Sequence, residues 1–445
     1  MAFHLLDVLG KEQVDPKDLA HRSNVSYQTV WRAVKAAGDQ VVQWRVGRKN
    51  LLAATRPPYA VPIRAIDGEG AVHAIEPLHP LRDGGSVWLN WAGKVSAFAG
   101  LPPEIEHARP QGFLGRAFAH HIAESPTYRG RIASNPDVWD SDLLLEVLSA
   151  RAVDLPGNLI VGDGAFELYL ADRSEPIEDT NIEAAFSARA AAAIAGEVPG
   201  SSAAGEQPKF TAAVRDAQGH VRHVIVKFSP PTDTALGERW ADLLAAEHIA
   251  GQVLREHQFE AASTELLDIR GRRMLVSERF DRLGSRGRLG VISLRAVDDE
   301  YFGRLSTPWV AASYRLESAG MLSASDASAM RVLGAFGRYI ANSDMHYGNV
   351  SFFCDVLQPG PMALAPIYDM LPMRFAPARN ELRPLTPSTD AVNETTGISR
   401  KEHVAALEMA TAFWSRCTAD DRLSAPFREL CDAQRALAAK LLRST

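Results

Sequence analysis

A strand-turn-strand segment in the last quarter of the sequence constrains the fold more than any other part. An amphipathic helix pattern leads into "ANSDMHYGN" (341–349), and "VSFFCD" follows as a predicted strand. "QPGP" then turns the chain, and "MALAPIYDM" returns as a second strand. Because a hairpin brings its two ends together, we expect Asn349 and Asp369 to lie side by side, with Asp344 in the same tight loop.

These three side chains carry oxygen atoms of the kind that phosphoryl transfer needs. One carboxylate accepts or orients a substrate hydroxyl, while an Asn oxygen and a second carboxylate hold a metal ion against a triphosphate. Such hard oxygen ligands favour Mg²⁺ over zinc. His346 either orients Asp344 by a hydrogen bond or simply packs. The alternative interpretation of the whole cluster is a structural polar loop without chemistry.

An apolar run further upstream ends in a lysine that can reach phosphate oxygens. The segments "TAAVRD" and "QGHVRHVIVKF" predict a hairpin that turns at Asp216 to Gly219, with Lys227 near its end. In the helix pattern that follows, Glu247 can pair with Lys227, and Glu238 competes for it. A lysine on a strand paired with a glutamate on a helix is the arrangement found in protein kinases. Without such a partner, a lysine that ends a strand is usually just solvated.

Two further segments complete the predicted nucleotide site. The small residues of "SSAAGEQPKF" (201–210) let backbone N–H groups approach phosphate oxygens, and we expect Ser202 and Gly205 to contact the nucleotide there. In "RRMLVSERFDR" a short apolar strand breaks into polar residues. Glu278 and Phe280 then lie where an adenine would find backbone donors and acceptors. A surface hairpin explains this second segment equally well.

The first 57 residues predict a small basic module. The net charge of the chain is −6, yet residues 20–56 contain seven Lys or Arg and one acid. Three short helix patterns precede "VVQWRVGRKNLLAATR", a hairpin signal, and together they resemble a winged helix. We expect Trp31 to face outward with the residues that would contact DNA, which are Tyr27, Gln28, Arg32, Lys35, Arg45, Arg48 and Lys49. The alternative is a winged helix that binds protein or dimerises.

The segment 58–196 carries weaker signals. It predicts a strand at "SVWLNW", a helix at "FLGRAFAHHIA", and an Ala-rich helix that runs into a domain boundary. His120 and His121 are adjacent on the second of these elements, so their rings point in different directions and do not share a metal.

Length and composition limit the class of protein. A chain of 445 residues with 46% apolar residues supports two or three domains. Its three cysteines lack CxxC spacing, which argues against a disulfide framework and against structural zinc. No apolar run approaches the roughly 18 residues of a membrane helix, and the N-terminus lacks the basic region of a signal peptide. We therefore expect a cytoplasmic protein.

Five motifs in one order resemble a known family. "SxxGxxPK", "VIVKF", "ERFDR", "NSDMHYGNVSFF" and "APIYDML" resemble the HipA-like serine/threonine kinases of bacterial toxin-antitoxin systems, and the added winged helix is similar to the YjjJ (HipH) branch. The resemblance implies an α+β fold with a two-lobed, protein-kinase-like core. Its implied domains are a winged helix-turn-helix (1–57), a HipA-like N-terminal subdomain (58–196), a kinase N-lobe (197–280) and a mostly helical C-lobe (281–445).

The resemblance also assigns roles by position. It makes Asp344 the catalytic base, with His346 beside it, Asn349 and Asp369 the magnesium ligands, and Lys227 the lysine that binds ATP phosphates. The implied activity is an ATP- and Mg²⁺-dependent serine/threonine protein kinase that acts as a growth-inhibiting toxin. By family analogy its substrate is a translation-related protein.

Regulation follows from the same resemblance. Ser202, or Ser201 beside it, aligns with the loop serine that the family autophosphorylates, and a phosphate adds about −1.5 to −2 charges that would expel the loop. Typical HipA proteins bind DNA through a separate antitoxin, whereas this chain has its own winged helix. Either no antitoxin is needed, or the winged helix has taken over DNA tethering. The segment "GVISLRAVDDEYFG" lacks the His-Glu-Asp pattern expected after the hinge.

Two other functions remain open on the sequence. One is a DNA-binding transcription regulator whose kinase fold senses nucleotide without catalysis. The other is a kinase for small molecules. If the winged helix binds DNA, the protein is nucleoid-associated, and a helix-turn-helix antitoxin is a further partner.

Overall fold

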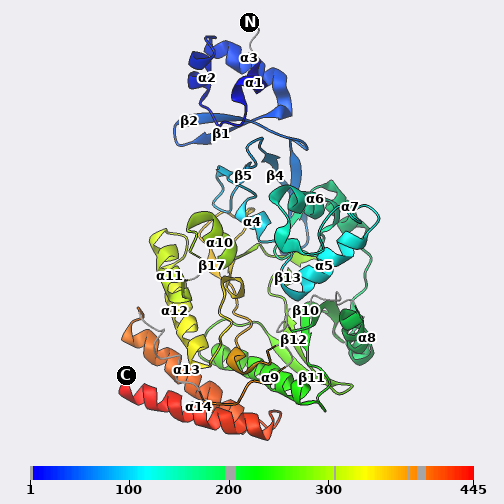
Figure 1. The fold of residues 1–445 in the computed structure, drawn as a ribbon, viewed down its shortest axis with the longest axis vertical. Coiled ribbons are helices and arrows are strands. Elements are labelled where there is room, and N and C mark those ends of the chain that lie inside the picture. The colour runs from blue at the N-terminus through cyan, green and yellow to red at the C-terminus, as the bar shows by residue number, and fades with distance from the viewer. Residues whose placement is uncertain (1–3, 196–206, 305–306, 379–380, 388–396) are drawn as a thin grey trace.

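The computed structural model has a mixed α+β fold, which confirms the predicted class. It describes residues 4–195, 207–304, 307–378, 381–387 and 397–445. An N-terminal module lies at one end of the long axis, a middle domain follows it, and two lobes occupy the other end (Figure 1). Within the described ranges, every helix is too short or too polar to cross a bilayer.

The N-terminal module has three helices and a two-stranded hairpin, in the predicted order. They are α1 (Leu5–Leu9), α2 (Pro16–Arg22), α3 (Tyr27–Ala37), β1 (Val41–Val46) and β2 (Lys49–Ala54). Asp15 and Ser26 begin α2 and α3, because their side chains accept hydrogen bonds from N–H groups of the first turn. Leu9, Leu19 and Val30 are buried in a small core to which all five elements contribute.

One face of the hairpin packs on the middle domain, a contact that the sequence did not predict. Val42 and Trp44 of β1 share an apolar cluster with Leu81 and Val87. Figure 1 shows the hairpin between the three helices and the middle domain, so α3 lies on the outer side of the module. The apolar face of the hairpin therefore attaches the N-terminal module to the middle domain, while the tip of the hairpin stays at the surface.

The middle domain is an antiparallel sheet with helices on both faces. Its strand order is β6 (Val95–Phe98), β5 (Ser86–Leu89), β4 (Val72–Pro80), β3 (Val61–Ile66) and β7 (Leu159–Val161). The helices are α4 (Pro103–Glu106), α5 (Gly112–Glu124), α6 (Ser141–Arg151) and α7 (Asp163–Ala171). Helices α4 to α6 share one core with the sheet, and α7 packs on its other face. The strand and the helix predicted here are confirmed as β5 and α5, and His120 is half-buried while His121 is exposed.

A second five-stranded sheet forms the N-lobe. Its order is β11 (Thr264–Ile269), β12 (Arg272–Glu278), β10 (Val221–Phe228), β9 (Lys209–Arg215) and β8 (Ile177–Glu178). The predicted hairpin is β9 with β10. Strand β8 pairs with β9, and Phe186 of α8 (Ile182–Ala195) is buried against this sheet. The predicted subdomain 58–196 therefore ends too late, because β8 and α8 belong to the N-lobe.

The C-lobe is mostly helical, as predicted, and surrounds a small three-stranded sheet. The strands are β15 (Val291–Ser293), β16 (Ser351–Phe353) and β17 (Ala363–Leu364). The helices are α10 (Leu294–Tyr301), α11 (Trp309–Ser318), α12 (Ala324–Tyr339), α13 (Arg400–Ala419) and α14 (Ala425–Ser444). Their core is continuous with the long helix α9 (Ala235–Glu256) of the N-lobe. The two lobes thus share one large apolar core.

The strand-turn-strand segment is confirmed, but its second strand is shorter than expected. Residues 363–364 pair with β16, and the chain then leaves that sheet. Pro366 has no N–H to donate, and the N–H of Ile367 donates to Glu260 O of the other lobe. A parallel bridge between Ile367 and Ala261 follows. The segment before Asp369 therefore crosses from the C-lobe to the N-lobe.

The middle domain and the C-lobe meet at a buried carboxyl group. Glu104 of α4, which contacts α10, is 7% exposed. Its Oε1 accepts a hydrogen bond of 2.6 Å from the Trp91 N–H, and its Oε2 has no partner in the described part of the chain. Burial raises the pKa of Glu104 to about 7 against the opposing effect of that hydrogen bond. Burial at this interface therefore favours the protonated form of Glu104.

We expect Glu104→Gln to stabilise the protein at alkaline pH. The raised pKa means that the contribution of Glu104 to stability is complete below pH 4.5 and is lost as pH rises through about 7. Gln mimics the protonated acid, so the variant should gain about 3 kcal/mol of unfolding free energy at pH 8 and less than about 1 kcal/mol at pH 5. Urea unfolding at both pH values measures this. The exposed Glu124→Gln is the control, and equal pH slopes for wild type and Glu104→Gln would contradict the assignment.

Candidate active site

Lys227 lies buried between two carboxylates at the centre of the site. Strand β10 places it opposite Leu275 of β12, and its Nζ lies 2.6 and 2.7 Å from the two carboxylate oxygens of Glu247 on α9. The same Nζ contacts Oδ1 of Asp369. Glu238, the predicted competitor, is exposed. The ion pair of Lys227 with Glu247 is therefore confirmed, and Asp369 joins it as a second partner.

Lys227 and Asp369 stabilise each other's charged form, whereas burial and the charge of Asp369 raise the pKa of Glu247. Burial alone would lower the pKa of Lys227, but Asp369 and Glu247 outweigh it and hold that pKa above its usual value. Burial would likewise raise the pKa of Asp369, but the charges of Lys227 and Lys209 hold it at about 2. The lysine and the Asp369 carboxylate are therefore both ionised at neutral pH.

Side-chain hydrogen bonds fix the loop 342–349 against Asp369. Asn342 Nδ2 donates to the backbone oxygen of Asp369 at 3.2 Å, while its Oδ1 accepts from the Asp344 N–H at 3.0 Å. Asn349 Nδ2 donates to Asp344 O at 2.7 Å. Asn342 is buried and was missed by the sequence analysis, although an Asn two residues before an Asp is a signal for this local turn. These bonds hold the backbone of the loop that carries Asp344 and Asn349 against the backbone of Asp369.

Asp344 and His346 are the exposed members of the site. Their side chains are 52% and 59% exposed, and His346 Nε2 lies 4.0 Å from Asp344 Oδ1, which is too far for a hydrogen bond. His346 Nδ1 instead accepts from the Gly348 N–H at 3.0 Å and begins the short helix η4 (Tyr347–Asn349). His346 therefore does not orient Asp344 by a hydrogen bond, which was one of its two expected roles, and instead caps the loop. A part for His346 in catalysis stays a prediction.

Tyr368 is a second residue that the sequence analysis missed. Its hydroxyl donates to Gly348 O at 2.7 Å and lies 2.9 Å from Ser351 Oγ. Its ring centroid is 5.9 Å from that of Phe280, the aromatic residue predicted to border the adenine. Burial raises the pKa of Tyr368, and the Asp369 charge adds to this, so the hydroxyl keeps its proton. Tyr368 thus joins the loop 342–349 to Phe280.

Glu278 does not offer the backbone donor that was expected. Its side chain is exposed, and its N–H donates to Ser263 O at 2.8 Å. The next N–H, of Arg279, donates to His223 O at 2.8 Å. Both amides belong to contacts between strands and loops of the N-lobe, so they are not free to bind a base. Phe280 packs against the rings of Phe353 and Tyr368, and its contact with an adenine stays a prediction.

The side chains present fit a magnesium ion bound to a triphosphate. Asp369 offers an ionised carboxylate, and the hydrogen bond that Asn349 donates leaves its Oδ1 as an acceptor. In the described ranges, no group of three or more His, Cys, Asp and Glu side chains could hold a metal by itself. Mg²⁺ suits such a site because it takes one or two protein ligands and completes its shell with phosphate and water oxygens. Ser201, Ser202 and Gly205 lie outside the described residues.

The predicted DNA contacts lie on the surface of the N-terminal module. Every one of the seven is exposed, on α3 (Tyr27, Gln28, Arg32 and Lys35) or on the hairpin (Arg45, Arg48 and Lys49). Trp31 is corrected, because it is half-buried against the module's core, with its ring 5.9 Å from that of Tyr27. Two other basic residues form ion pairs, Arg22 with Glu12 and Arg56 with Asp142. The remaining basic side chains face solvent.

We expect Lys227→Met to destabilise the protein by about 3 kcal/mol at pH 7, because it leaves the buried carboxylate of Glu247 and the half-buried one of Asp369 without their cation. Their pKa values should then rise, so the loss should shrink as pH falls toward 5. Chemical unfolding at pH 5 and 7 measures both effects. The double variant Lys227→Met/Glu247→Leu should recover part of the loss, and the exposed Lys401→Met is the control. A double variant less stable than the single one would contradict this account.

Comparison with known proteins gives the family. Residues 58–170 match the family model "YjjJ-like toxin, middle domain", and residues 201–438 match the "HipA-like C-terminal domain". Toxin YjjJ of Escherichia coli (strain K12) is 35% identical over 434 residues, which cover 96% of this chain and 95% of that protein.

A solved structure supports the fold. HipA of Shewanella oneidensis MR-1, in a complex with HipB and operator DNA, aligns with a TM-score of 0.52 over 86% of this chain and 99% of that chain. The sequences are 12% identical, so the likeness concerns the fold alone. With the match to Toxin YjjJ over nearly the whole length, the chain belongs to the YjjJ-like toxins, whose C-terminal part is a HipA-like domain.

Proposed function

We propose that the protein is an ATP- and Mg²⁺-dependent serine/threonine protein kinase that acts as a toxin of the HipA type. The observation that carries this proposal is the position of Lys227. It is buried between Glu247 and Asp369, next to the loop that presents Asp344 and Asn349. A strand lysine held by a helix glutamate beside a carboxylate and an amide is the set of parts used in phosphoryl transfer.

Each side chain has a defined task in this proposal. Glu247 holds Lys227 where its ammonium group can meet phosphate oxygens. Asn349 and Asp369 would hold Mg²⁺, which when bound neutralises charge on the phosphates of ATP. Asp344 lies at the solvent-facing edge and accepts the proton of the substrate hydroxyl. Two hydrogen bonds, with Asn342 and Asn349, hold the backbone from which the Asp344 carboxylate projects.

The exposure of Asp344 favours a protein substrate over a small metabolite. Half of its side chain faces solvent, so a serine or threonine on another protein can reach it without entering an enclosed pocket. A translation-related protein is the substrate class that the family resemblance implies. The loop serine, Ser202 or Ser201, is proposed as the acceptor in autophosphorylation.

We expect Asp344→Asn to lower phosphoryl transfer about 10²- to 10⁴-fold, because the amide cannot accept the hydroxyl proton. Asn keeps the size of the side chain and the backbone hydrogen bonds, so the unfolding temperature should stay within about 2 °C of wild type. Incubation with labelled ATP and Mg²⁺, followed by mass spectrometry of phosphoserine, gives the measurement.

Asp421→Asn is the matched control, since Asp421 is an exposed carboxylate distant from the loop in sequence. It should label as wild type does. Equal labelling of Asp344→Asn and wild type would remove Asp344 from the mechanism. Absence of labelling in wild type, with ATP bound, would favour the nucleotide-sensing alternative.

The N-terminal module is proposed to bind DNA. Its support is the exposed set of basic side chains on the outer helix α3 and on the hairpin, and the anchoring of the hairpin by Trp44. Helix α3 offers Gln28 and Arg32, which can read base edges, while Arg48 and Lys49 can contact phosphates. The HipA structure described above contains HipB and operator DNA. For this chain, DNA and a helix-turn-helix antitoxin remain proposed partners.

We expect Arg48→Ala/Lys49→Ala to weaken binding of a DNA duplex and to reduce the slope of log K against log salt by about 1–2 units, one for each lost phosphate contact. Fluorescence anisotropy with a labelled duplex over a salt series gives the slope. Arg22→Ala is the control, because Arg22 is paired with Glu12 at 2.8 Å. A double variant with the slope of wild type would exclude the hairpin from the DNA contact.

A further inference from the structure

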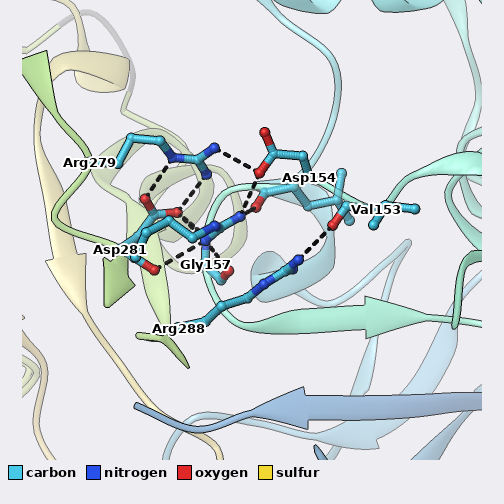
Figure 2. Close-up of polar contacts among 8 residues, drawn as sticks. Val153, Asp154, Gly157, Arg279, Asp281 and Arg288 are labelled. Atoms are coloured by element: carbon cyan, nitrogen blue, oxygen red, sulfur yellow. Dashed lines mark hydrogen bonds and ion pairs between the residues drawn. The ribbon is translucent and has the colours of Figure 1, made fainter. Parts of the chain in front are cut away.

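A network of arginines and aspartates ties the middle domain to the chain that joins the two lobes (Figure 2). This linking segment, residues 279–288, leads from β12 into the C-lobe and contains two short strands. They are β13 (Arg282–Leu283) and β14 (Gly287–Arg288). Figure 2 shows Arg279, Asp281 and Arg288 of the linking segment facing Asp154 and Gly157 of the middle domain. The network lies outside the site described above.

Asp281 is the centre of the network. It is 6% exposed, and its carboxylate accepts from Arg279 Nε and Nη2, both at 3.0 Å. It also accepts from Arg282 Nη1 at 2.7 Å and from the Gly157 N–H at 2.9 Å. Burial would raise the pKa of Asp281, but the two guanidinium groups hold it below its usual value. The carboxylate is therefore ionised and fully hydrogen-bonded.

Two arginines extend these contacts into the middle domain. Arg282 donates to Gly157 O at 2.9 Å, to Leu155 O at 2.5 Å and to Asp154 Oδ1 at 3.0 Å. Arg279 Nη1 reaches the same oxygen of Asp154 at 2.7 Å. Asp154 lies outside the linking segment, and its carboxylate thus binds both of these arginines.

The network holds more positive than negative charge. Arg279 and Arg282 pair with the carboxylates of Asp154 and Asp281, while Arg288 beside them donates to the backbone oxygen of Val153 at 3.0 Å. Burial, and after it the charge of Arg282, lowers the pKa of Arg288 to about 10. Without Asp154, three buried cations would face one carboxylate. They would have to separate or take up water, and the backbone that carries them would shift.

Phe280 connects this network to the candidate site. It lies in the chain between the two residues that Figure 2 shows facing each other, Arg279 and Asp281. Its ring centroid is 5.8 Å from that of Phe353 and 5.9 Å from that of Tyr368. Tyr368 directly precedes Asp369, so Phe280 contacts the segment that carries a proposed magnesium ligand.

We propose that Asp154 is a positioning residue for the nucleotide site. By holding the two arginines on either side of Phe280, it fixes this ring and, through the aromatic contacts, the segment that carries Asp369. The effect on ATP rests on the proposed kinase function, whereas the effect on the segment does not. Asp154 is in the middle domain, so the domain that also anchors the N-terminal module contributes to the geometry of the site.

The test is Asp154→Asn, measured first by hydrogen–deuterium exchange in the full chain without nucleotide. We expect amide exchange to rise about three- to tenfold in residues 279–289 and also in residues 366–370, with the rest unchanged. In phosphoryl transfer we expect KM for ATP to rise about three- to tenfold, with kcat within about twofold of wild type. Asp154→Glu keeps the charge and should stay close to wild type in both measurements.

Asp163→Asn is the matched control. Asp163 is on the same domain, its Oδ1 lies 2.7 Å from Arg64 Nη2, and its side chain is 62% exposed, against 54% for Asp154. It should change neither exchange nor KM. Wild-type exchange at 366–370 in Asp154→Asn, or a uniform rise over the whole chain, would overturn the inference. If wild type transfers no phosphate, the proposed function fails, and the exchange measurement still decides the role of Asp154.

Discussion

One buried ammonium group joins the three parts of the core. Lys227 comes from the N-lobe sheet, Glu247 from the helix whose apolar face belongs to the C-lobe core, and Asp369 from the segment that returns from β17. A buried cation with two carboxylates requires all three to keep their places, because any one left alone would carry an uncompensated charge. Asn342 attaches the loop that carries Asp344 to this cluster, because its side chain bonds to the backbone of both Asp344 and Asp369.

Much of this site could be predicted because its signals are local. Asn349 and Asp344 are five residues apart, and the turn at "QPGP" sets where Asp369 returns. The ion pair of Lys227 with Glu247 followed from the order of strand and helix. Asn342 and Tyr368 were missed because their importance lies in hydrogen bonds to backbone oxygens of residues distant in sequence, Asp369 and Gly348, which no spacing pattern shows.

Elements with a clear hydrophobic periodicity were predicted well. Elements whose place in the fold depends on contacts with other elements were predicted less well. The helices of the N-terminal module and the hairpin of β9 and β10 follow their patterns. Strand β8 has two residues and carries no periodicity, so only its pairing with β9 reveals that it belongs to the N-lobe. The helical position of Trp31 predicted an outward side chain. In the structure its large ring lies at the edge of the module's small core and packs partly against it.

The short second strand of the strand-turn-strand segment has a mechanical consequence. Residues 363–364 pair with β16 in the C-lobe, while three residues later Ile367 is bridged to Ala261 of the N-lobe. Because so few residues separate these two attachments, the span between them cannot lengthen much. If the two lobes moved apart, this span would be strained first. Asp369 is the second residue after it. We therefore expect any separation of the two lobes to displace Asp369, the residue proposed to bind Mg²⁺.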